Sequence, residues 1–199
     1  MKIIGLTGGS GAGKGEVCKA FLSFGIESVD TDKISREVTR KGSECLRELT
    51  EKFSGRILGG YGELDRKKLA EIAFSSRENL DMLNGITHRH ILNECGRIII
   101  DMQTAGRRAV IIDAPMLFDS GFDKSCDFII SVVADSDKRI ERIIKRDNIT
   151  REQAETRIKN QKSDGFFIGN SDYVIYNNSD YADVYIQTGK IYDMIFKTD

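Results

Sequence analysis

The sequence predicts an α/β fold built around a parallel sheet. Three short apolar runs, at residues 3–6, 109–112 and 128–133, are continuous rather than alternating, which is typical of strands buried on both faces of a sheet. Segments with the helical spacing of apolar residues lie between them, and a glycine-rich loop directly follows the first run. Such an alternation of strands and helices indicates an α/β fold with right-handed crossovers.

Weaker patterns supply the other expected elements. Residues 28–29 and 173–176 are candidates for two more strands. Apolar residues at helical spacing form two stripes, Val17, Phe21 and Phe24 in the first and Ile140, Ile143 and Ile144 in the second. The residues Thr-Arg-Glu-Gln at 150–153 match a capping box and predict a helix that runs to about residue 161.

One stretch, residues 64–104, does not alternate. It has helix-type patterning without a strand, with apolar positions at Leu69, Ile72, Ala73, Leu80, Leu83, Ile86 and Ile91. We therefore expect a helical lobe, at about residues 60–105, inserted between strands of the sheet. Because the sequence contains no repeat, low-complexity run or flexible linker, residues 1–199 are expected to form a single domain.

The composition excludes several classes of protein. The 199 residues are 40% apolar and 31% charged, a balance that can bury a core and is too apolar for disorder. The 30 basic and 31 acidic side chains give a formal charge of −1, which argues against general binding to nucleic acid or to an anionic membrane. The sequence shows neither a membrane span nor a signal peptide. We expect a cytoplasmic protein that is a monomer or a small homo-oligomer.

Cysteine and histidine give no metal pattern. The four cysteines lack C-x-x-C spacing and are interpreted as plain buried or half-buried thiols. His88 and His90 are two residues apart on a predicted helix, so they face different directions and cannot chelate one metal together. The sequence leaves the ligands of any metal unknown.

The strongest local signal is the G-x-x-x-x-G-K loop from Gly8 to Lys14, which follows a predicted strand and opens a predicted helix. Glycines let successive backbone N–H groups converge on phosphate oxygens, while the helix N-terminus and Lys14 add positive charge. The alternative is a glycine-rich turn without function, which the combination of strand, spacing and lysine disfavours. The loop predicts a nucleotide, with Lys14 as the residue that carries the phosphate charge.

Gly15 departs from this motif. A serine or threonine normally follows the lysine and supplies a hydroxyl ligand to Mg²⁺, but Gly15 has no side chain that could reach a metal. We expect phosphate binding to survive, because the backbone and Lys14 provide it. Mg²⁺ is then held by nucleotide phosphates, water and other carboxylates.

Two carboxylates at the end of the second predicted strand are candidates for the acceptor side. Open α/β sheets bind ligands at this edge, and phosphoryl transfer to a hydroxyl needs a carboxylate that orients the hydroxyl and takes its proton. Asp30 or Asp32 can do so, while the other serves as a helix N-cap. On the pattern alone, capping and catalysis remain equally open for each of them.

An arginine stripe occupies one face of the helix predicted around residue 140. Arg139, Arg142 and Arg146 are spaced i, i+3, i+7, away from the isoleucine stripe. Such a stripe is most often a solvated helix face. Beside a phosphate-binding loop it can instead belong to a lid that neutralises the transferring phosphoryl group and excludes water.

Along nearly its whole length the sequence resembles the dephospho-coenzyme A (dephospho-CoA) kinase family. Several elements occur in the order of the family's motifs: the loop at 5–14, V-D-T-D at 29–32 followed by Arg36, L-D-R at 64–66 with Leu69 and Phe74, L-N at 83–84 with T-H at 87–88, D-A-P-M-L-F at 113–118, Arg142, Arg146, Asp147 and Gln161 of its lid, and D-Y-V-I-Y-N at 172–177. Several elements in the right order are far more specific than the loop alone.

The resemblance implies a three-layer P-loop fold like that of nucleoside-monophosphate kinases, with a five-stranded parallel sheet, the inserted substrate lobe and a helical lid at about residues 139–167. It implies transfer of a phosphoryl group from ATP, with Mg²⁺, to the ribose 3′-hydroxyl of dephospho-CoA. The implied catalytic residues are Lys14, Asp32 and Arg142. The implied ATP-binding residues are Gly9, Ser10, Gly11, Ala12, Gly13, Lys14, Gly15, Glu16, Arg142, Arg146 and Asn177. The implied substrate-binding residues are Asp32, Arg36, Arg66, His88 and Leu117.

Besides Gly15, two residues depart from the family pattern: Arg89 stands where a proline usually follows the histidine, and Phe167 where the lid usually has a basic residue. We expect Arg89 to affect only the lobe's geometry and Phe167 to affect phosphate contacts.

The sequence leaves two alternatives to a dephospho-CoA kinase open. One is a P-loop kinase for another small hydroxyl substrate, and the other is a nucleotide-binding protein with weak catalysis because of Gly15.

Overall fold

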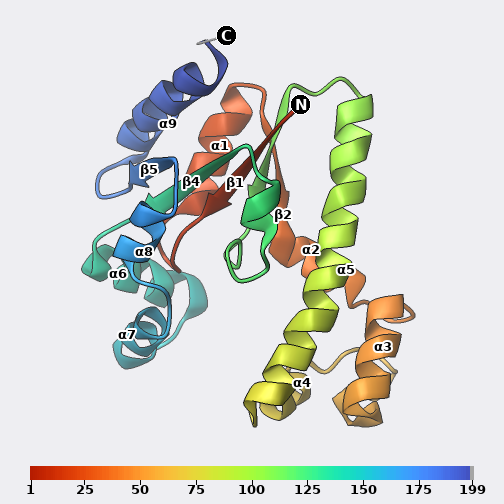
Figure 1. Cartoon of the computed structure of the whole chain (residues 1–199). Coiled ribbons are helices and arrows are strands. Elements are labelled where there is room, and N and C mark those ends of the chain that lie inside the picture. The colour runs from red at the N-terminus through yellow and green to blue at the C-terminus, as the bar shows by residue number, and fades with distance from the viewer. Residues whose placement is uncertain (198–199) are drawn as a thin grey trace. The chain divides into compact units, whose positions relative to one another are not determined.

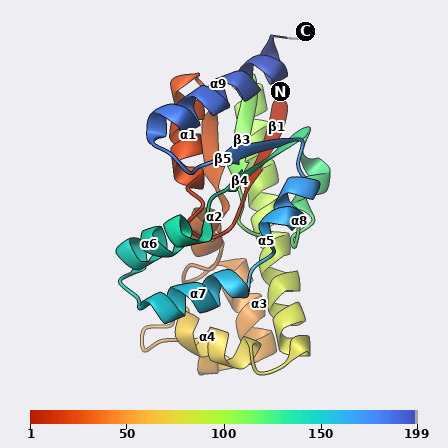
Figure 2. The same ribbon diagram turned by 90° about the vertical axis from the view of Figure 1, so that its left-hand side faces the viewer.

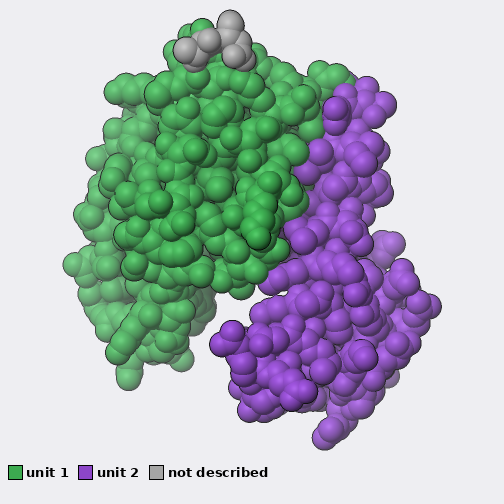
Figure 3. Space-filling view, in the orientation of Figure 1, with its two compact units in different colours: residues 1–29, 106–199 green, residues 30–105 purple. Residues whose placement is uncertain are grey.

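The computed structural model describes residues 1–197 (Figure 1). The backbone divides into two compact units, which Figure 3 distinguishes by colour. The first unit comprises Met1–Val29 and Gly106–Asp199 and contains nearly all of the sheet, and the second comprises Asp30–Ala105 and is helical.

Five strands form one sheet in the order β2-β3-β1-β4-β5. They are β1 (Lys2–Thr7), β2 (Glu27–Asp30), β3 (Ala109–Asp113), β4 (Phe128–Val133) and β5 (Tyr173–Tyr176). The pairs β1–β3, β1–β4 and β4–β5 are parallel. The three continuous apolar runs are the three central strands, and side chains such as Ile4, Ile111 and Ile130 are completely buried. The predicted α/β class, with its parallel sheet, is therefore confirmed.

The helices of the first unit are α1 (Lys14–Ser23), α6 (Ser136–Asp147), α7 (Arg151–Lys159), α8 (Asp164–Gly169) and α9 (Tyr181–Phe196), with a short 3-10 helix at Phe122–Ser125. Helices α1 and α9 pack together on one face of the sheet (Figures 1 and 2). Val17 and Phe21 of the predicted apolar stripe of α1 face this core, and both are fully buried. The glycine-rich loop between β1 and α1 is thus fixed at both ends.

Helices α6 and α7 form a hairpin with a small apolar core of its own. Ile140 and Ile143 of α6 pack against Ala154 of α7. The predicted capping box is present, because Thr150 Oγ1 accepts from the Gln153 N–H and Gln153 Oε1 accepts from the Thr150 N–H. The helix ends at Lys159, two residues before the expected end.

The second unit contains α2 (Thr31–Val38), α3 (Glu44–Phe53), a 3-10 helix (Gly55–Ile57), α4 (Arg66–Ala73) and α5 (Arg77–Thr104). Helices α4 and α5 occupy the stretch in which the sequence pattern predicted helices without a strand. The unit also includes α2, which follows the expected N-cap at Asp30 or Asp32, and α3, for which the pattern made no prediction. Its apolar core joins α3, α4 and α5 through residues such as Leu49, Leu69 and Ile86. Over residues 1–197 no helix has the length and apolarity needed to cross a membrane.

Candidate active site

The glycines of the loop at residues 8–14, the P-loop, are required by its geometry. Gly8, Gly11 and Gly13 have φ angles of 142°, 78° and 97°, which other residues rarely adopt. A Cβ at Gly8 would lie 2.3 Å from the Val132 carbonyl oxygen, and one at Gly13 would lie 2.0 Å from Asn177 Nδ2. The spacing of the motif therefore corresponds to a turn that only glycine permits at these positions.

The P-loop and the start of α1 are suited to an anion. Gly13 is the N-cap of α1 and makes no side-chain cap hydrogen bond, so no capping side chain competes with an anion for the first amides of α1. Lys14 adds a positive charge at the same helix end, with its Nζ 3.4 Å from the Gly8 carbonyl oxygen. The glycine turn is followed by a helix N-terminus and a lysine. This combination fits a nucleotide phosphate chain.

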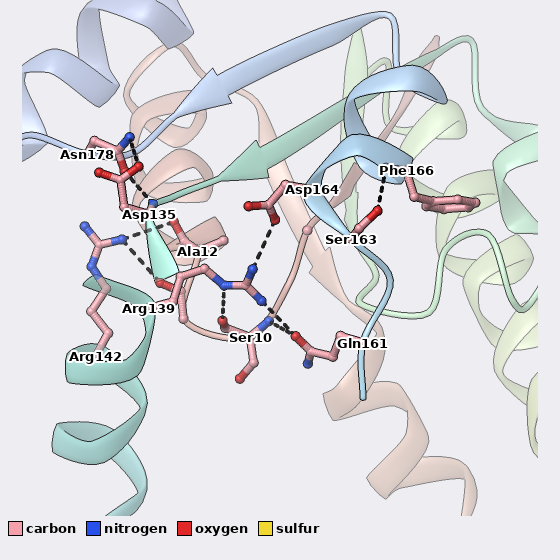
Figure 4. Close-up of polar contacts among 12 residues, drawn as sticks. Ser10, Ala12, Asp135, Arg139, Arg142, Gln161, Ser163, Asp164, Phe166 and Asn178 are labelled. Carbon is pink, nitrogen blue, oxygen red and sulfur yellow. Dashed lines mark hydrogen bonds and ion pairs between the residues drawn. The ribbon is translucent and has the colours of Figure 1, made fainter. Parts of the chain in front are cut away.

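Arg142 and Asn177 lie against the P-loop, as Figure 4 shows for the arginine. Arg142 Nη1 donates to the carbonyl oxygens of Gly11 (3.2 Å) and Ala12 (3.4 Å), and its Nη2 donates to Asn177 Oδ1 (3.0 Å). The buried Asn177 donates through Nδ2 to the Ala12 carbonyl oxygen (3.0 Å) and to Glu16 Oε2 (2.7 Å). The structure thus brings these expected ATP-binding residues together, and Arg142 contacts both the backbone of the loop and Asn177.

The arginine stripe of α6 is not a solvated face throughout. Arg146 is exposed and places Nη2 3.2 Å from Ser10 Oγ, but the Arg139 residue is only 3% exposed. The solvated-face alternative is therefore wrong for Arg139, whose guanidinium reaches the P-loop backbone. Arg146 also bonds Asp147, and this contact together with Arg157 holds the pKa of the Asp147 carboxyl well below its usual range.

A direct side-chain ligand for Mg²⁺ is not evident around Gly15. A Cβ at Gly15 would meet no heavy atom within 4 Å, so the position beside Lys14 has space for a larger residue. Within the described part of the chain, no group of three or more His, Cys, Asp or Glu side chains is arranged to hold a metal ion. Asp113 ends β3 beside Leu6 of β1, and it is a hard oxygen donor of the type that Mg²⁺ prefers.

The second unit holds the expected acceptor-side residues. Asp30 is the N-cap of α2, because its Oδ1 accepts from the N–H groups of Asp32 (2.9 Å) and Lys33 (3.1 Å). Asp32 itself is exposed in the first turn of α2. Of the two roles that the sequence left open, capping therefore belongs to Asp30, and the Asp32 carboxylate is the one that remains for an acceptor hydroxyl.

Three further expected substrate residues lie on separate helices of this unit. Arg36 is exposed on α2, Arg66 begins α4 and His88 lies on α5. Arg66 Nη2 donates to Thr39 Oγ1 at 2.8 Å. The departure at Arg89 is explained locally, because its guanidinium pairs with Glu48 of α3, and His90 Nε2 lies 3.1 Å from the same carboxylate. Arg89 therefore links α5 to α3 within this unit.

Two aromatic or aliphatic residues differ from expectation in their surroundings. Leu117 is completely buried and its side chain lies against Gly5, so the structure offers no exposed surface of this residue for the expected contact with a substrate. Phe167 is 4% exposed and packs on Phe118 and Phe166. Its position in a core, not on a phosphate-facing surface, explains why an apolar residue stands here in place of a basic one.

The cysteines are free thiols, as expected, and burial is the main cause that raises the pKa of each of them. Cys18 on α1 is the one beside the site. Burial and the neighbouring Asp113 raise the pKa of its thiol to about 12, so it stays protonated at neutral pH. A protonated thiol is a poor nucleophile, so the structure gives Cys18 a packing role.

Comparison with known proteins gives one consistent result. The family model of dephospho-CoA kinase matches residues 2–183. A dephospho-CoA kinase of Fusobacterium nucleatum is 40% identical over 185 residues, which are 93% of this chain and 94% of that protein. One of Corynebacterium glutamicum is 34% identical over 96% of both chains.

Solved structures agree with the fold. Dephospho-CoA kinase from Campylobacter jejuni superposes with a TM-score of 0.72 at 25% identity, over 100% of this chain and 99% of that one. Shikimate kinase from Acinetobacter baumannii superposes with a TM-score of 0.55 at 16% identity, over 100% of this chain and 95% of that one. The second likeness concerns the fold alone, which is the P-loop kinase fold in both cases.

Proposed function

Because the chain belongs to the dephospho-CoA kinase family, we propose that it transfers the γ-phosphoryl group of ATP to the ribose 3′-hydroxyl of dephospho-CoA. The products are coenzyme A, ADP and a proton. The strongest support is the match of the family model to residues 2–183, which includes the P-loop, the acceptor-side aspartate and the lid. Neither alternative, another acceptor or weak catalysis, is favoured by the relatives, which carry the same name over almost the whole chain.

Residues of the first unit bind and neutralise ATP in this proposal. The amides of the P-loop and of the start of α1 bind phosphate oxygens, and Lys14 offsets the charge that the transferring group carries. Arg142 and Asn177 hold the loop's carbonyl oxygens, so that its N–H groups remain directed at the anion. Arg146, exposed on α6 beside Ser10, supplies a further positive charge.

Asp32 orients the acceptor hydroxyl and takes its proton as the new phosphate ester bond forms. Arg36, Arg66 and His88 of the same unit are the groups that we assign to the coenzyme portion of the substrate. Mg²⁺ would neutralise phosphate charge when bound, and either Asp113 or Asp32 could hold it through water.

A coupled assay of ADP release tests the proposal. The purified protein is given ATP with dephospho-CoA, with adenosine monophosphate or with shikimate, and the phosphorylated product is identified by mass. We expect turnover with dephospho-CoA alone. Turnover with another acceptor would support a different kinase, and ATP binding without turnover on any acceptor would support the weakly catalytic alternative.

The substitution Lys14→Ala tests whether the reaction takes place at the P-loop. We expect it to lower kcat on the order of 10²-fold or more, because a charge that stabilises the transition state is removed. Lys19→Ala is the matched control, since Lys19 is an exposed lysine on the same helix. Near-normal turnover of Lys14→Ala would show that this loop is not the catalytic cradle.

A further inference from the structure

All three polar groups of Ser10 in the P-loop are bound by side chains from distant parts of the chain, and Figure 4 shows the contacts with Gln161 and Arg139. Its N–H donates to Gln161 Oε1 at 2.9 Å, and its carbonyl oxygen accepts from Arg139 Nε at 3.0 Å. Its hydroxyl oxygen lies 3.2 Å from Arg146 Nη2. Tertiary contacts, and not the loop's own backbone alone, therefore determine where this peptide lies.

Arg139 is at the centre of these contacts. Besides Ser10, it bonds Gln161 Oε1 through Nη2 and Asp164 Oδ1 through Nη1, each at 3.0 Å. Its side chain is 4% exposed, and the Asp164 side chain is 39% exposed. A guanidinium is planar and carries its donors on three nitrogens in fixed directions, so it can hold three acceptors that lie apart, whereas an ammonium carries its donors on one atom. One side chain of α6 thus joins the P-loop to Gln161, between α7 and α8, and to Asp164 at the start of α8.

Gly9 is adapted to the same guanidinium. A Cβ at this position would lie 2.2 Å from Arg139 Nη2 and 3.2 Å from Gln161 Oε1. Gly9 is not among the glycines with positive φ, so its backbone conformation is open to other residues. The reason for glycine here is the close approach of Arg139.

We propose that Arg139 is a positioning residue for phosphoryl transfer, which fixes the P-loop at Ser10 by holding it together with Gln161 and Asp164. The inference rests on the proposed kinase function. Arg139 acts through the loop and does not contact the reacting atoms. Catalysis of phosphoryl transfer depends on donors that are already in place, and a displacement of about 1 Å can cost on the order of 10²-fold in rate. A loop held at Ser10 from outside is in place before ATP binds.

Steady-state kinetics of four variants test this role. Arg139→Gln and Arg139→Lys are each expected to lower kcat per folded molecule by about tenfold or more, while KM for dephospho-CoA changes by less than about twofold. Arg151→Gln is the matched control, because Arg151 is a lid arginine, 58% exposed, whose partners are Asp137 and Glu155 and not the P-loop. A wild-type kcat in Arg139→Lys would mean that a positive charge alone suffices, and it would overturn the proposal that Arg139 clamps Ser10, Gln161 and Asp164 together.

Gly9→Ala provides the fourth variant and a double-mutant cycle with Arg139→Gln. The added methyl group displaces the guanidinium, so Gly9→Ala should reproduce the loss of kcat. Because both changes remove the same contact, the double variant should be no worse than either single one by more than about twofold. If the fold losses of kcat of the two single variants multiply in the double variant, Gly9 and Arg139 act independently, and this would contradict the proposal.

Hydrogen exchange on the ligand-free protein gives a readout that needs no activity. The Ser10 N–H is protected by Gln161, and we expect its exchange to be at least about tenfold faster in Arg139→Gln and Gly9→Ala than in the wild type. Unchanged exchange, or a lower melting temperature with unchanged kcat, would leave Arg139 with a structural role only and would overturn the proposal. If the wild type itself fails to phosphorylate dephospho-CoA, the proposed function fails, and exchange at Ser10 still decides whether the clamp exists.

Discussion

Gly15 occupies the position after the P-loop lysine, where a hydroxyl commonly binds Mg²⁺. We expect Gly15→Ser to move the Mg²⁺ dependence of turnover to lower concentration, by about tenfold if the new ligand contributes about 1.4 kcal/mol. The substitution has space, because a Cβ there meets no heavy atom within 4 Å, and serine is favoured over glycine by roughly 0.5 kcal/mol within a helix. A titration of activity against Mg²⁺ measures the shift.

The matched control for this titration is Gly96→Ser on α5, another helical glycine whose added Cβ meets open space. It should leave the Mg²⁺ dependence unchanged. An identical titration for Gly15→Ser and the wild type would show that other groups hold the metal.

Asp30 and Asp32 have different expected phenotypes. Asp32→Asn should lower kcat on the order of 10²-fold with ATP affinity little changed, because a general base is lost while the nucleotide is held by the other unit. Asp30→Ala removes the cap of α2 and should cost about 1 kcal/mol of unfolding free energy. Kinetics and thermal unfolding of both variants separate the two roles. Equal losses of kcat in Asp30→Asn and Asp32→Asn would contradict the assignment.

At the residue scale, sequence patterns find a functional group when its neighbours along the chain define it. The P-loop glycines, Lys14 and the capping aspartates are of this kind, since the adjacent strand or helix fixes their surroundings. Arg139 is different. Its burial depends on Ser10, 129 residues away, and on Gln161, 22 residues away, so the spacing of the arginines alone favoured a solvated helix face.

The lid is the element for which a conformational response is expected. Helices α6 and α7 share an apolar core, and Asp147 bonds both Arg146 and Arg157 across their junction. We therefore expect the hairpin to move as a body, with Arg146 of α6 as the arginine that meets the nucleotide phosphates. We expect Arg142→Ala to lower kcat by about tenfold, because one donor to the P-loop backbone is lost.

Limited proteolysis measures the same response in the wild type. Trypsin cleavage between about residues 139 and 167 should slow when ATP and dephospho-CoA are both bound, because closure of the lid protects its arginines. Cleavage after the exposed Lys124 of the 3-10 helix is the internal reference. Cutting within 139–167 that ignores both ligands would argue against a lid.

Elements differ in how far the sequence determines them. The central strands are recognisable because continuous apolar runs reflect burial on both faces, and α7 is recognisable by its capping box. Helix α8 has six residues and shows no period, because its place is set by the packing of Phe166 and Phe167 on Phe118. The centroids of Phe118 and Phe166 lie 5.2 Å apart, and Lys162 bonds Asp119 at 3.0 Å, so α8 is fixed to the loop after β3.

At the scale of the whole molecule, the prediction concerns which unit binds ATP and which binds dephospho-CoA. All residues that we assign to ATP belong to Met1–Val29 and Gly106–Asp199, whereas Asp30–Ala105 holds Asp32, Arg36, Arg66 and His88 and has an apolar core of its own. A ligand stabilises the part that binds it, by an amount that rises with its concentration relative to Kd. If the two units unfold independently of each other, each ligand should slow hydrogen exchange only in the unit that binds it.

Hydrogen exchange with each ligand in turn tests this division. At 100 times its Kd, a nucleotide should add about 2.7 kcal/mol to the opening free energy of the unit that binds it. ADP, which is not turned over, is therefore expected to slow exchange throughout the strands and α1 of the first unit and to leave the core amides of α3 and α5 near their ligand-free rates. Dephospho-CoA added without nucleotide should protect α2, α4 and α5 instead. Equal protection of both units by ADP alone would show that the chain opens as one cooperative body, in agreement with a single domain over residues 1–199 and against independent units.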